Sequence, residues 1–488
     1  MASADAMSRP EDARTAAALD RRRWRGLVVM LLAAFMDIVD TTVVLIAAPT
    51  IRSDLGASYA DIQWVVAAYA LALGLVLVTG GRLGDILGRK RLFLSGVAVF
   101  TAASAACALA PSIGALIAAR AVQGAAAGLM IPQILATVQV SFPPAERPKA
   151  YGAYGAMNGL GAAAAPIIGG LLVGNDVLGL AWRSVFWINV PVGLVALIAG
   201  AVLVAESRSA RRPRLDLPGV VIVSVGLLLL LYPLIQGGEL DWPGWSFAMM
   251  AAAVPVLAAF AWYQARRERR GFPLVPMSLF RLRTFVSGLG VTVVAFSTIS
   301  AIFLVLTLQL QAGHGFSALE VGLTFMAWPI GLAATSTLAV RLAPSLGRRL
   351  ISAGTLTLAV AMVVTIAMIH RGGAGLGAWH LVPGLALGGL GFGLVAPIAV
   401  DIVLSAVPEA DAGAASGVTN TAIYVGIAAG VAVIGAVFTT LLERGRGIDA
   451  AASTALWYPA AAFALAFAFS FALPARVRAP RDATPTTT

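Results

Sequence analysis

Residues 80–96 read GGRLGDILGRKRLFLSG and form a short charged connector between two apolar runs. The connector contains one acid, Asp85, which is flanked by Gly81 and Gly88. The basic residues Arg89 and Lys90 follow. Glycine permits a tight turn and a close approach between helices, and an acid can pair with an arginine or cap a helix N-terminus. We therefore expect these five residues to form a gating motif whose ion pair breaks when the flanking helices move.

The sequence on either side of the connector is mostly apolar. The chain has 488 residues, of which 59% are hydrophobic and 12% charged, whereas a soluble domain carries about 25% charged residues. A membrane-spanning helix needs about 20 apolar residues, and fourteen stretches meet this condition. They are 26–48, 62–80, 92–110, 113–138, 151–173, 185–205, 218–236, 246–265, 285–311, 319–340, 350–369, 381–405, 414–441 and 453–474. The sequence predicts an all-α integral membrane protein without a globular domain.

The basic residues indicate an orientation. If the N-terminus is cytoplasmic, 28 of the 34 Lys and Arg residues lie in cytoplasmic segments and five lie in outside loops, while Arg120 lies within a span. Cytoplasmic loops carry an excess of Lys and Arg, so we expect a multi-pass cell-membrane protein with both termini in the cytoplasm. The loop 406–413 is an exception, because its charges are Glu409 and Asp411.

Several motifs resemble those of the major facilitator superfamily. The connector resembles the loop motif of this superfamily, and VRLAPSLGRRL (340–350) is a partial copy that suggests duplicated halves. Other stretches resemble the fourteen-helix drug:proton antiporter branch: VDTTVVLIAAP (39–49), IQWVVAAYALA (62–72), ARAVQGAAAG (119–128), GAAAAPIIGG (161–170), WRSVFWINVPVG (182–193) and PLVPMSLFRLRTF (273–285). The chain departs from this branch at Leu45, where Asn is usual, and at Ile423 and Tyr424, where an Arg-Gln pair is common.

This resemblance implies a major facilitator fold with two six-helix bundles and two extra central helices. The implied segments are a cytoplasmic N-terminal segment 1–25, a first bundle 26–205, a linker with two extra helices 206–270, a second bundle 271–474 and a cytoplasmic tail 475–488. It also implies a gating role for Gly161, Pro166, Gly169 and Gly170 in the fifth span. The implied function is secondary active export, in which protons are exchanged for amphipathic or cationic drugs by alternating access.

Two acids stand inside the first span, within FMDIVDTTVV (35–44). An ionised Asp at a helix centre costs roughly 2.5–3.5 kcal/mol, and such residues mark ion or substrate pathways. With a rise of 1.5 Å per residue, Asp40 lies roughly 21 Å along a hydrocarbon core about 30 Å thick, and Arg120 lies ~10 Å from its outer edge. Asp40 and Arg120 are therefore expected at nearly equal depth, with Asp37 one turn closer to the midplane.

Asp37 and Asp40 are three positions apart and can share one helix face, so we expect both carboxylates to face one cavity. Two neighbouring carboxylates in a low dielectric cannot both ionise at low cost, and such a pair titrates as a unit. Arg120 is always charged and can stabilise the deprotonated state. The alternative is a fixed ion pair that holds the first and fourth spans together. Asp40 is the stronger candidate for the proton site, because it matches the acid of the branch, and Asp37 is the candidate accessory.

Other polar and aromatic residues in or beside the spans are candidates for substrate binding. They are Gln63, Trp64, Tyr69, Gln123, Asn158, Asn189, Trp328, Asp401 and Asn420. Aromatic rings can stack on a cationic substrate, but hydrogen bonding between helices and helix packing are the alternative roles. Asp401 can face the cavity or approach the cytoplasmic interface.

Two other classes of function were compared with export. Proton symport of a polar solute is disfavoured by the fifth-span motif and by the few sugar-binding polar residues in the spans. An enzyme or a signalling receptor is disfavoured because the sequence has no Walker loop, HExxH motif or Cys/His cluster. We expect no metal and no cofactor, since the proton gradient is the energy source. The expected partners are protons, a drug-like small molecule and the lipid bilayer, without nucleic acid, and the expected state is a monomer.

Overall fold

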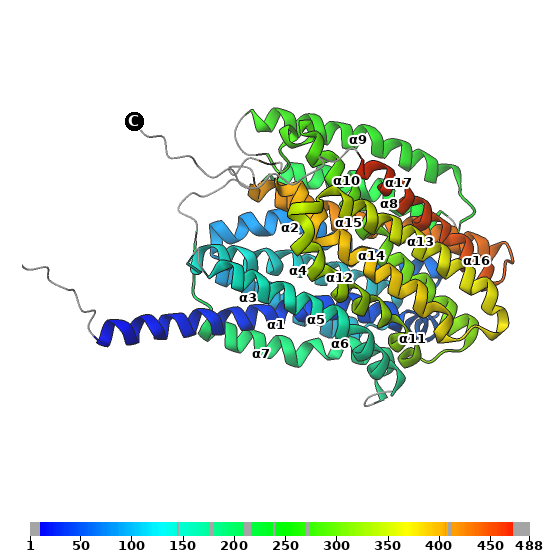
Figure 1. The fold of residues 1–488 in the computed structure, drawn as a ribbon, viewed down its shortest axis with the longest axis horizontal. Helices are drawn as coiled ribbons and strands as arrows, with labels where there is room; N and C mark the ends of the chain where they lie inside the picture. Colours follow the sequence, from blue (N-terminus) through cyan, green and yellow to red (C-terminus); the bar gives the residue numbers. More distant parts are fainter. Residues whose placement is uncertain are drawn as a thin grey trace, which may run out of the picture.

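The computed structural model describes residues 10–143, 146–175, 179–208, 216–237, 240–269, 273–405, 407 and 412–471, and its regular structure in these ranges is helical. Within these ranges, fourteen helical stretches are long and apolar enough to cross a membrane, so the predicted number of spans is confirmed. Most of them run side by side along one direction (Figure 1). We call the face where α1 begins the N-terminal face, and the face where α1 ends the opposite face.

The helices follow the predicted order. The first group comprises α1 (Pro10–Leu55), α2 (Tyr59–Leu87), α3 (Arg89–Ala108), α4 (Ile113–Ser141), α5 (Arg147–Gly174), η2 (Ala181–Arg183), α6 (Ser184–Trp187) and α7 (Asn189–Leu203). Next come α8 (Leu217–Gln236) and α9 (Gly244–Glu268). The last group comprises η3 (Met277–Arg281), α10 (Arg283–Leu308), η4 (Gln309–Gly313), α11 (Ala318–Phe325), α12 (Ala327–Leu346), α13 (Arg348–Gly372), η5 (Gly373–Gly375), α14 (Ala378–Ser405), α15 (Ala412–Glu443), α16 (Ile448–Ala455) and α17 (Trp457–Ser470).

Three spans are interrupted, and a proline follows each interruption. Pro191, Pro329 and Pro459 are each the third residue of the second helical piece. Proline has no N–H group to donate to the carbonyl four residues earlier. Those carbonyls belong to Trp187, Phe325 and Ala455, the last residues of α6, α11 and α16. Each span therefore divides where its hydrogen-bond ladder loses one donor.

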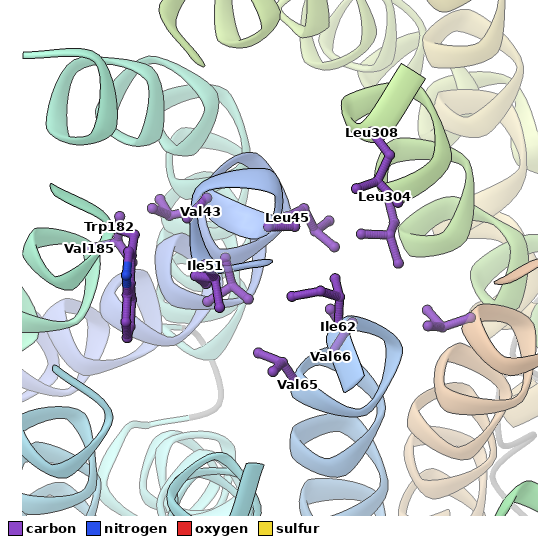
Figure 2. Close-up of a cluster of buried hydrophobic side chains, with 14 of the residues drawn as sticks. Val43, Leu45, Ile51, Ile62, Val65, Val66, Trp182, Val185, Leu304 and Leu308 are labelled. Carbon is purple, nitrogen blue, oxygen red and sulfur yellow. The ribbon is translucent and has the colours of Figure 1, made fainter. Parts of the chain in front are cut away.

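We use N half for residues 26–205 and C half for residues 271–474; this division stays a prediction. A buried apolar cluster joins the two halves near the opposite face. Figure 2 shows Leu45 of α1 and Ile62 of α2 in this cluster, together with Leu304 and Leu308 of α10. Gln311 adds a polar link, because its Nε2 donates to the carbonyl oxygen of Ile46 at 2.9 Å. The halves are therefore packed together on the opposite face.

Helix α8 covers the line where α2 meets α15. Leu231 and Ile235 of α8 pack in one cluster with Ala67 of α2 and Ala428 of α15. The outer surfaces of the helices are strongly apolar, with Ile198 71% exposed and Val254 69% exposed. Apolar surface of this kind suits contact with lipid. The helices also suit lipid because they satisfy their backbone polar groups internally.

Candidate functional site

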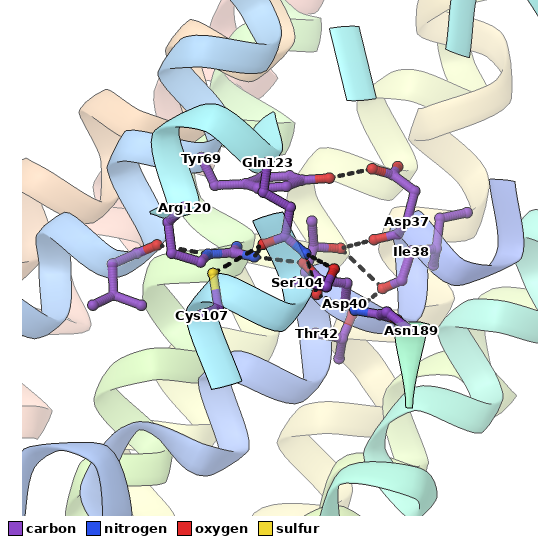
Figure 3. A network of polar contacts seen from close by, with 12 residues as sticks. Asp37, Ile38, Asp40, Thr42, Tyr69, Ser104, Cys107, Arg120, Gln123 and Asn189 are labelled. Atoms are coloured by element: carbon purple, nitrogen blue, oxygen red, sulfur yellow. Dashed lines mark hydrogen bonds and ion pairs between the residues drawn. The ribbon is translucent and has the colours of Figure 1, made fainter. Parts of the chain in front are cut away.

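Asp40 lies at the centre of a buried polar cluster (Figure 3). Its Oδ2 atom is 2.5 Å from Nη1 of Arg120, and its Oδ1 atom accepts from Nε2 of Gln123 at 2.9 Å and from Nδ2 of Asn189 at 2.7 Å. None of these four side chains belongs to a residue more than 2% exposed. Helices α1, α4 and α7 therefore meet at a carboxylate that is compensated by one cation and two amides.

Arg120 is satisfied by several further partners. Its Nε atom donates to the carbonyl oxygen of Val65 at 3.1 Å, and Nη1 also donates to Oε1 of Gln123 at 2.7 Å. Its guanidinium lies 4.1 Å from the ring centroid of Tyr69. A buried ion pair of this kind is strongly destabilised when one partner is removed. These contacts support the fixed ion pair that the sequence left open as an alternative.

Asp37 has a different environment. It accepts a hydrogen bond from the hydroxyl of Tyr69 and lines a cavity of about 290 Å³. Of the described side chains, none forms an ion pair with Asp37. Asp40 is not among the described residues that line this cavity, because it turns toward α4 and α7. The expectation that both carboxylates face one cavity is met by Asp37 but not by Asp40.

The 290 Å³ cavity, which we call the central cavity, lies between the halves. Its lining includes Thr41, Val66 and Tyr69 from the N half and Phe296, Ser300, Phe392 and Ile423 from the C half. The described walls are mostly apolar and aromatic, with a few hydroxyl groups, the carboxylate of Asp37 and one edge of Arg120, whose charge is paired with Asp40. Such a site suits an amphipathic molecule, since aromatic faces attract cations and a carboxylate in a low dielectric favours a positive group.

Tyr69 links the two acidic groups. Its hydroxyl bonds Asp37, while its ring face carries the guanidinium of Arg120, which pairs with Asp40. One aromatic side chain therefore contacts both the cavity carboxylate and the buried ion pair. The sequence placed Tyr69 among the substrate candidates; the structure places it on the cavity wall and in the polar cluster.

A second cavity of about 440 Å³, which we call the N-terminal-face cavity, contains the connector motif. Its described lining includes Gly81, Arg82, Asp85 and Arg89 from the connector. The remaining lining residues come from both halves: Leu77, Ile131, Pro132, Leu135, Ala136, Gln139, Val140, Tyr154, Leu274, Gly417, Asn420 and Tyr424. The bundle is thus hollow on the N-terminal face and packed on the opposite face.

The connector contains the predicted ion pair. Nη2 of Arg89 lies 2.6 Å from Oδ1 of Asp85. Gly88 has a φ of 107°, which side chains rarely adopt, and a Cβ at this position would lie 2.5 Å from Oε1 of Glu206. Lys90 holds the end of α7 through a 2.6 Å bond from Nζ to the carbonyl oxygen of Ala201. The connector is therefore fastened to the end of the sixth span.

Arg82 extends from the connector toward the linker. It donates to the carbonyl oxygen of Pro273, next to the segment that leads into α10. Burial lowers the pKa of Arg82 below its ordinary value, and the nearby Asp216 carboxylate opposes that shift. Asp216 begins α8 and accepts from Nε2 of Gln264 at 2.7 Å and from the hydroxyl of Tyr263 at 2.9 Å. The extra helix pair thus contacts the region where both halves meet.

The predicted gating residues of α5 pack closely against other helices. A Cβ on Gly161 would lie 3.1 Å from Cγ2 of Ile38, and one on Gly169 would lie 3.1 Å from Cδ1 of Ile46, both on α1. A Cβ on Gly170 would lie 2.7 Å from Cα of Leu319 on α11, and one on Gly322 would overlap the carbonyl oxygen of Pro166. The Pro166 region of α5 is therefore in backbone contact with the C half near the opposite face.

The other substrate candidates lie in several places. Asn420 lines the N-terminal-face cavity, and Asn158 bonds the side chain of Tyr154, which lines it too. Gln123 and Asn189 belong to the Asp40 cluster.

Three further candidates pack against neighbouring helices, and one is not described. Gln63 is buried, with Gly435 of α15 close to its amide. Trp64 faces α8, where its ring lies 6.0 Å from that of Tyr232. Trp328 is 4% exposed in the core of the C half. Asp401 falls in α14, but its side chain lies outside the described residues.

Two tyrosines on the described cavity walls were not among the candidates from the sequence. Tyr154 and Tyr424 both line the N-terminal-face cavity, and Tyr424 lines the central cavity as well. A tyrosine within an apolar span carries no signal of its own, because packing uses the same residue. The departure of Tyr424 from the branch pattern was the one available indication.

The family described as Major Facilitator Superfamily matches residues 30–431. The chain is 42% identical over 438 residues to the "Probable actinorhodin transporter" of Streptomyces coelicolor, covering 89% of this chain and 76% of that relative. It is 36% identical to the "Tetracenomycin C resistance and export protein" of Streptomyces glaucescens, covering 86% and 77%. The "Multidrug resistance protein Stp" of Mycobacterium tuberculosis is 32% identical, with 87% and 78% covered.

Solved structures agree in fold. A peptide transporter, POT, in complex with sulfate superposes with a TM-score of 0.65 at 16% identity, covering 92% of this chain and 96% of that chain. A D-xylose-proton symporter superposes with a TM-score of 0.65 at 13% identity, covering 93% and 98%. At these identities the agreement concerns the fold alone.

Proposed function

This chain belongs to the major facilitator superfamily, and we propose that it is a secondary active exporter that exchanges protons for amphipathic or cationic small molecules. The family is one of transporters, not enzymes. The relatives named above are resistance and export proteins for antibiotics and other drugs. Their names support the same class of substrate for this chain, carried out of the cell through the cell membrane.

The observation that carries the proposal is the position of Asp37. It lies on the wall of the central cavity, while the neighbouring Asp40 is neutralised by Arg120. A carboxylate in a mostly apolar cavity can bind a proton or pair with a cationic group. A proton neutralises the carboxylate and removes its attraction for the cation, so the two compete. Competition of substrate and proton for one carboxylate produces exchange.

The conformation fits the stage of the cycle in which substrate is taken up from the cytoplasm. With both termini cytoplasmic, as the distribution of basic residues favours, the N-terminal-face cavity opens toward the cytoplasm. The contacts of Gly170 and Gly322 and the cluster around Leu45 and Leu304 close the opposite face. Rocking of the halves would separate these contacts and bring the central cavity to the outside.

In the proton step, Asp37 receives a proton when the cavity faces outward and releases it when the cavity faces the cytoplasm. Tyr69 donates to the charged carboxylate and stacks on Arg120. Arg120 supplies positive charge near both acids, so it favours the deprotonated state until a cationic substrate arrives. Asp40 keeps Arg120 in place. In this scheme Asp37 takes the larger role, and Asp40, which the sequence ranked first, acts through Arg120.

The proposal is tested with purified protein in proteoliposomes. With an acidic lumen, antiport predicts that the cationic dye ethidium accumulates inside while protons leave, as reported by an external pH indicator. Ethidium added without an imposed gradient is expected to drive proton movement in the opposite direction to its own. Movement of dye and protons in the same direction would establish symport. A rate of dye uptake that does not change with the pH gradient would exclude proton coupling.

The range of substrates is tested in cells. Expression in a drug-sensitive host without its own efflux pumps is expected to raise resistance to amphipathic and cationic antibiotics. A matched host carrying Asp37→Asn controls for effects of expression. Equal sensitivity of the expressing strain and the host without the protein to every compound in a broad panel would contradict drug export.

A further inference from the structure

The central cavity and the N-terminal-face cavity meet at a single side chain. Of the described residues that line them, Tyr424 is common to both. Asp37 lies on one side of this residue, and Tyr154 and Asn420 line the cavity on the other. A molecule that moves directly from one of these cavities to the other in this conformation passes beside Tyr424.

Tyr424 crosses the boundary between the halves. It belongs to α15 but packs against an apolar cluster of the N half that includes Tyr69, Leu73 and Leu77. On the N half it meets Gly74 of α2, where a Cβ would lie 3.0 Å from Cβ of Tyr424. The glycine allows α15 to approach α2, so the ring of Tyr424 occupies space between the two cavities.

The ring is held by packing on one side and has a polar end. It shares the lining of the central cavity with Asp37 and the lining of the N-terminal-face cavity with Tyr154. Tyr424 is only partly buried and borders both cavities, so its ring has space to turn about the χ1 and χ2 bonds. Rocking of the halves is a collective motion of microseconds to milliseconds, whereas turning this ring moves one side chain.

We propose that Tyr424 is a movable partition between two successive substrate subsites on one path. This inference rests on the proposed function. The N-terminal-face cavity accepts an amphipathic aromatic molecule between apolar side chains such as Leu77, Ile131 and Leu135 and polar ones such as Gln139. The ring of Tyr424 then turns aside, and the molecule reaches Asp37. Substrate size is selected at Tyr424 before the carboxylate is engaged.

The partition is tested by thiol labelling, which needs no transport. Cys107 is the single cysteine of the chain, so Cys107→Ala gives a background without thiols. Ser300→Cys reports on the central cavity and Ala136→Cys on the N-terminal-face cavity. Labelling rates are measured in inside-out membrane vesicles with a small charged methanethiosulfonate and with a bulkier maleimide.

With Tyr424 present, the labelling rate of Ala136→Cys is expected to be much higher than that of Ser300→Cys. The difference between the two rates is expected to be larger for the bulkier reagent. Tyr424→Ala is expected to accelerate labelling at Ser300→Cys roughly tenfold, as for removal of a modest barrier, and to leave Ala136→Cys unchanged. Tyr424→Phe keeps the ring and is expected to keep the slow rate. Tyr458→Ala, a truncation of a half-exposed tyrosine on α17, is the matched control and is expected to have no effect.

The proposal is overturned if Ser300→Cys reacts as fast as Ala136→Cys with Tyr424 intact, or if Tyr424→Ala leaves its rate unchanged. Tyr424→Leu serves where the alanine variant does not fold, because it keeps an apolar side chain but removes the ring. Failure of drug export would leave these labelling rates as they are, whereas failure of the partition would leave export intact. The two outcomes are therefore distinguishable.

Discussion

The carboxylate of Asp40 lies 2.5 Å from the guanidinium of Arg120, and both side chains are at most 1% exposed. One turn earlier on the same helix, Asp37 faces the central cavity. The two acids of the first span therefore have separate roles. One is held in a compensated cluster, and the other is available to protons and substrate.

Replacement of Asp40 is expected to reduce stability. Asp40→Asn leaves the buried Arg120 without its counter-ion, and removal of one partner of a buried pair costs about 3–5 kcal/mol. Thermal unfolding of the protein in detergent is expected to show a clearly lowered Tm. The double variant Asp40→Asn with Arg120→Gln removes both charges and should recover part of the loss. A Tm equal to that of the wild type in Asp40→Asn would contradict the ion-pair role.

Replacement of Asp37 is expected to reduce coupling with little effect on stability. Asp37→Asn keeps a partner for the Tyr69 hydroxyl but cannot gain or lose a proton in the cycle. Substrate-driven proton movement in proteoliposomes should disappear, while the Tm stays close to that of the wild type. Tyr69→Phe is the companion variant, because it removes the donor but keeps the ring below Arg120. Intact proton exchange in Asp37→Asn would refute the assignment.

An added methyl group at Gly322 is expected to prevent closure of the opposite face. Its Cβ would overlap the backbone carbonyl of Pro166, which cannot move as a flexible side chain can. Gly322→Ala should therefore favour conformations in which α5 and α11 are apart, and slow labelling of Ala136→Cys from the N-terminal face. Gly159→Ala on α5 is the control, since nothing lies within 4 Å of its Cβ. Equal labelling rates in the two variants would argue against this gate.

The connector offers a test that separates backbone strain from crowding. Gly88 and Gly56 both have positive φ angles, of 107° and 60°, but only a Cβ at Gly88 meets Glu206, and nothing lies within 4 Å at Gly56. Alanine at a left-handed position costs roughly 1–2 kcal/mol, so both variants should lose stability. Gly88→Ala should lose more and should also reduce transport, because it displaces Glu206 from the first turn of α3. A smaller Tm decrease for Gly88→Ala than for Gly56→Ala would contradict this reading.

The fourteen spans follow from local sequence, because runs of about 20 apolar residues are long enough to cross a bilayer. The breaks at Pro191, Pro329 and Pro459 do not follow from the prolines alone, since Pro132 and Pro166 also remove a donor and leave α4 and α5 continuous. The similar depth of Asp40 and Arg120 also followed from helix rise alone, whereas the contact between them depends on how α1 packs against α4.

The separation of Asp37 from Asp40 did not follow from the sequence. Residues three apart share a broad helix face, but the rotation of α1 against α2, α4 and α7 decides which neighbour each one meets. Asn189 bonds Asp40 across 149 positions of sequence, and no local pattern connects the two.

The sequence by itself determined the membrane character, the number of spans, the superfamily and the small set of polar residues able to act inside the bilayer. The tertiary structure decided which of those residues line a cavity, which faces of the bundle are packed and that Tyr424 stands between two cavities. The physical reason is that hydrophobicity and hydrogen bonding along a helix are properties of its own residues. A cavity is a property of the gaps between helices, which depend on how side chains from distant segments pack.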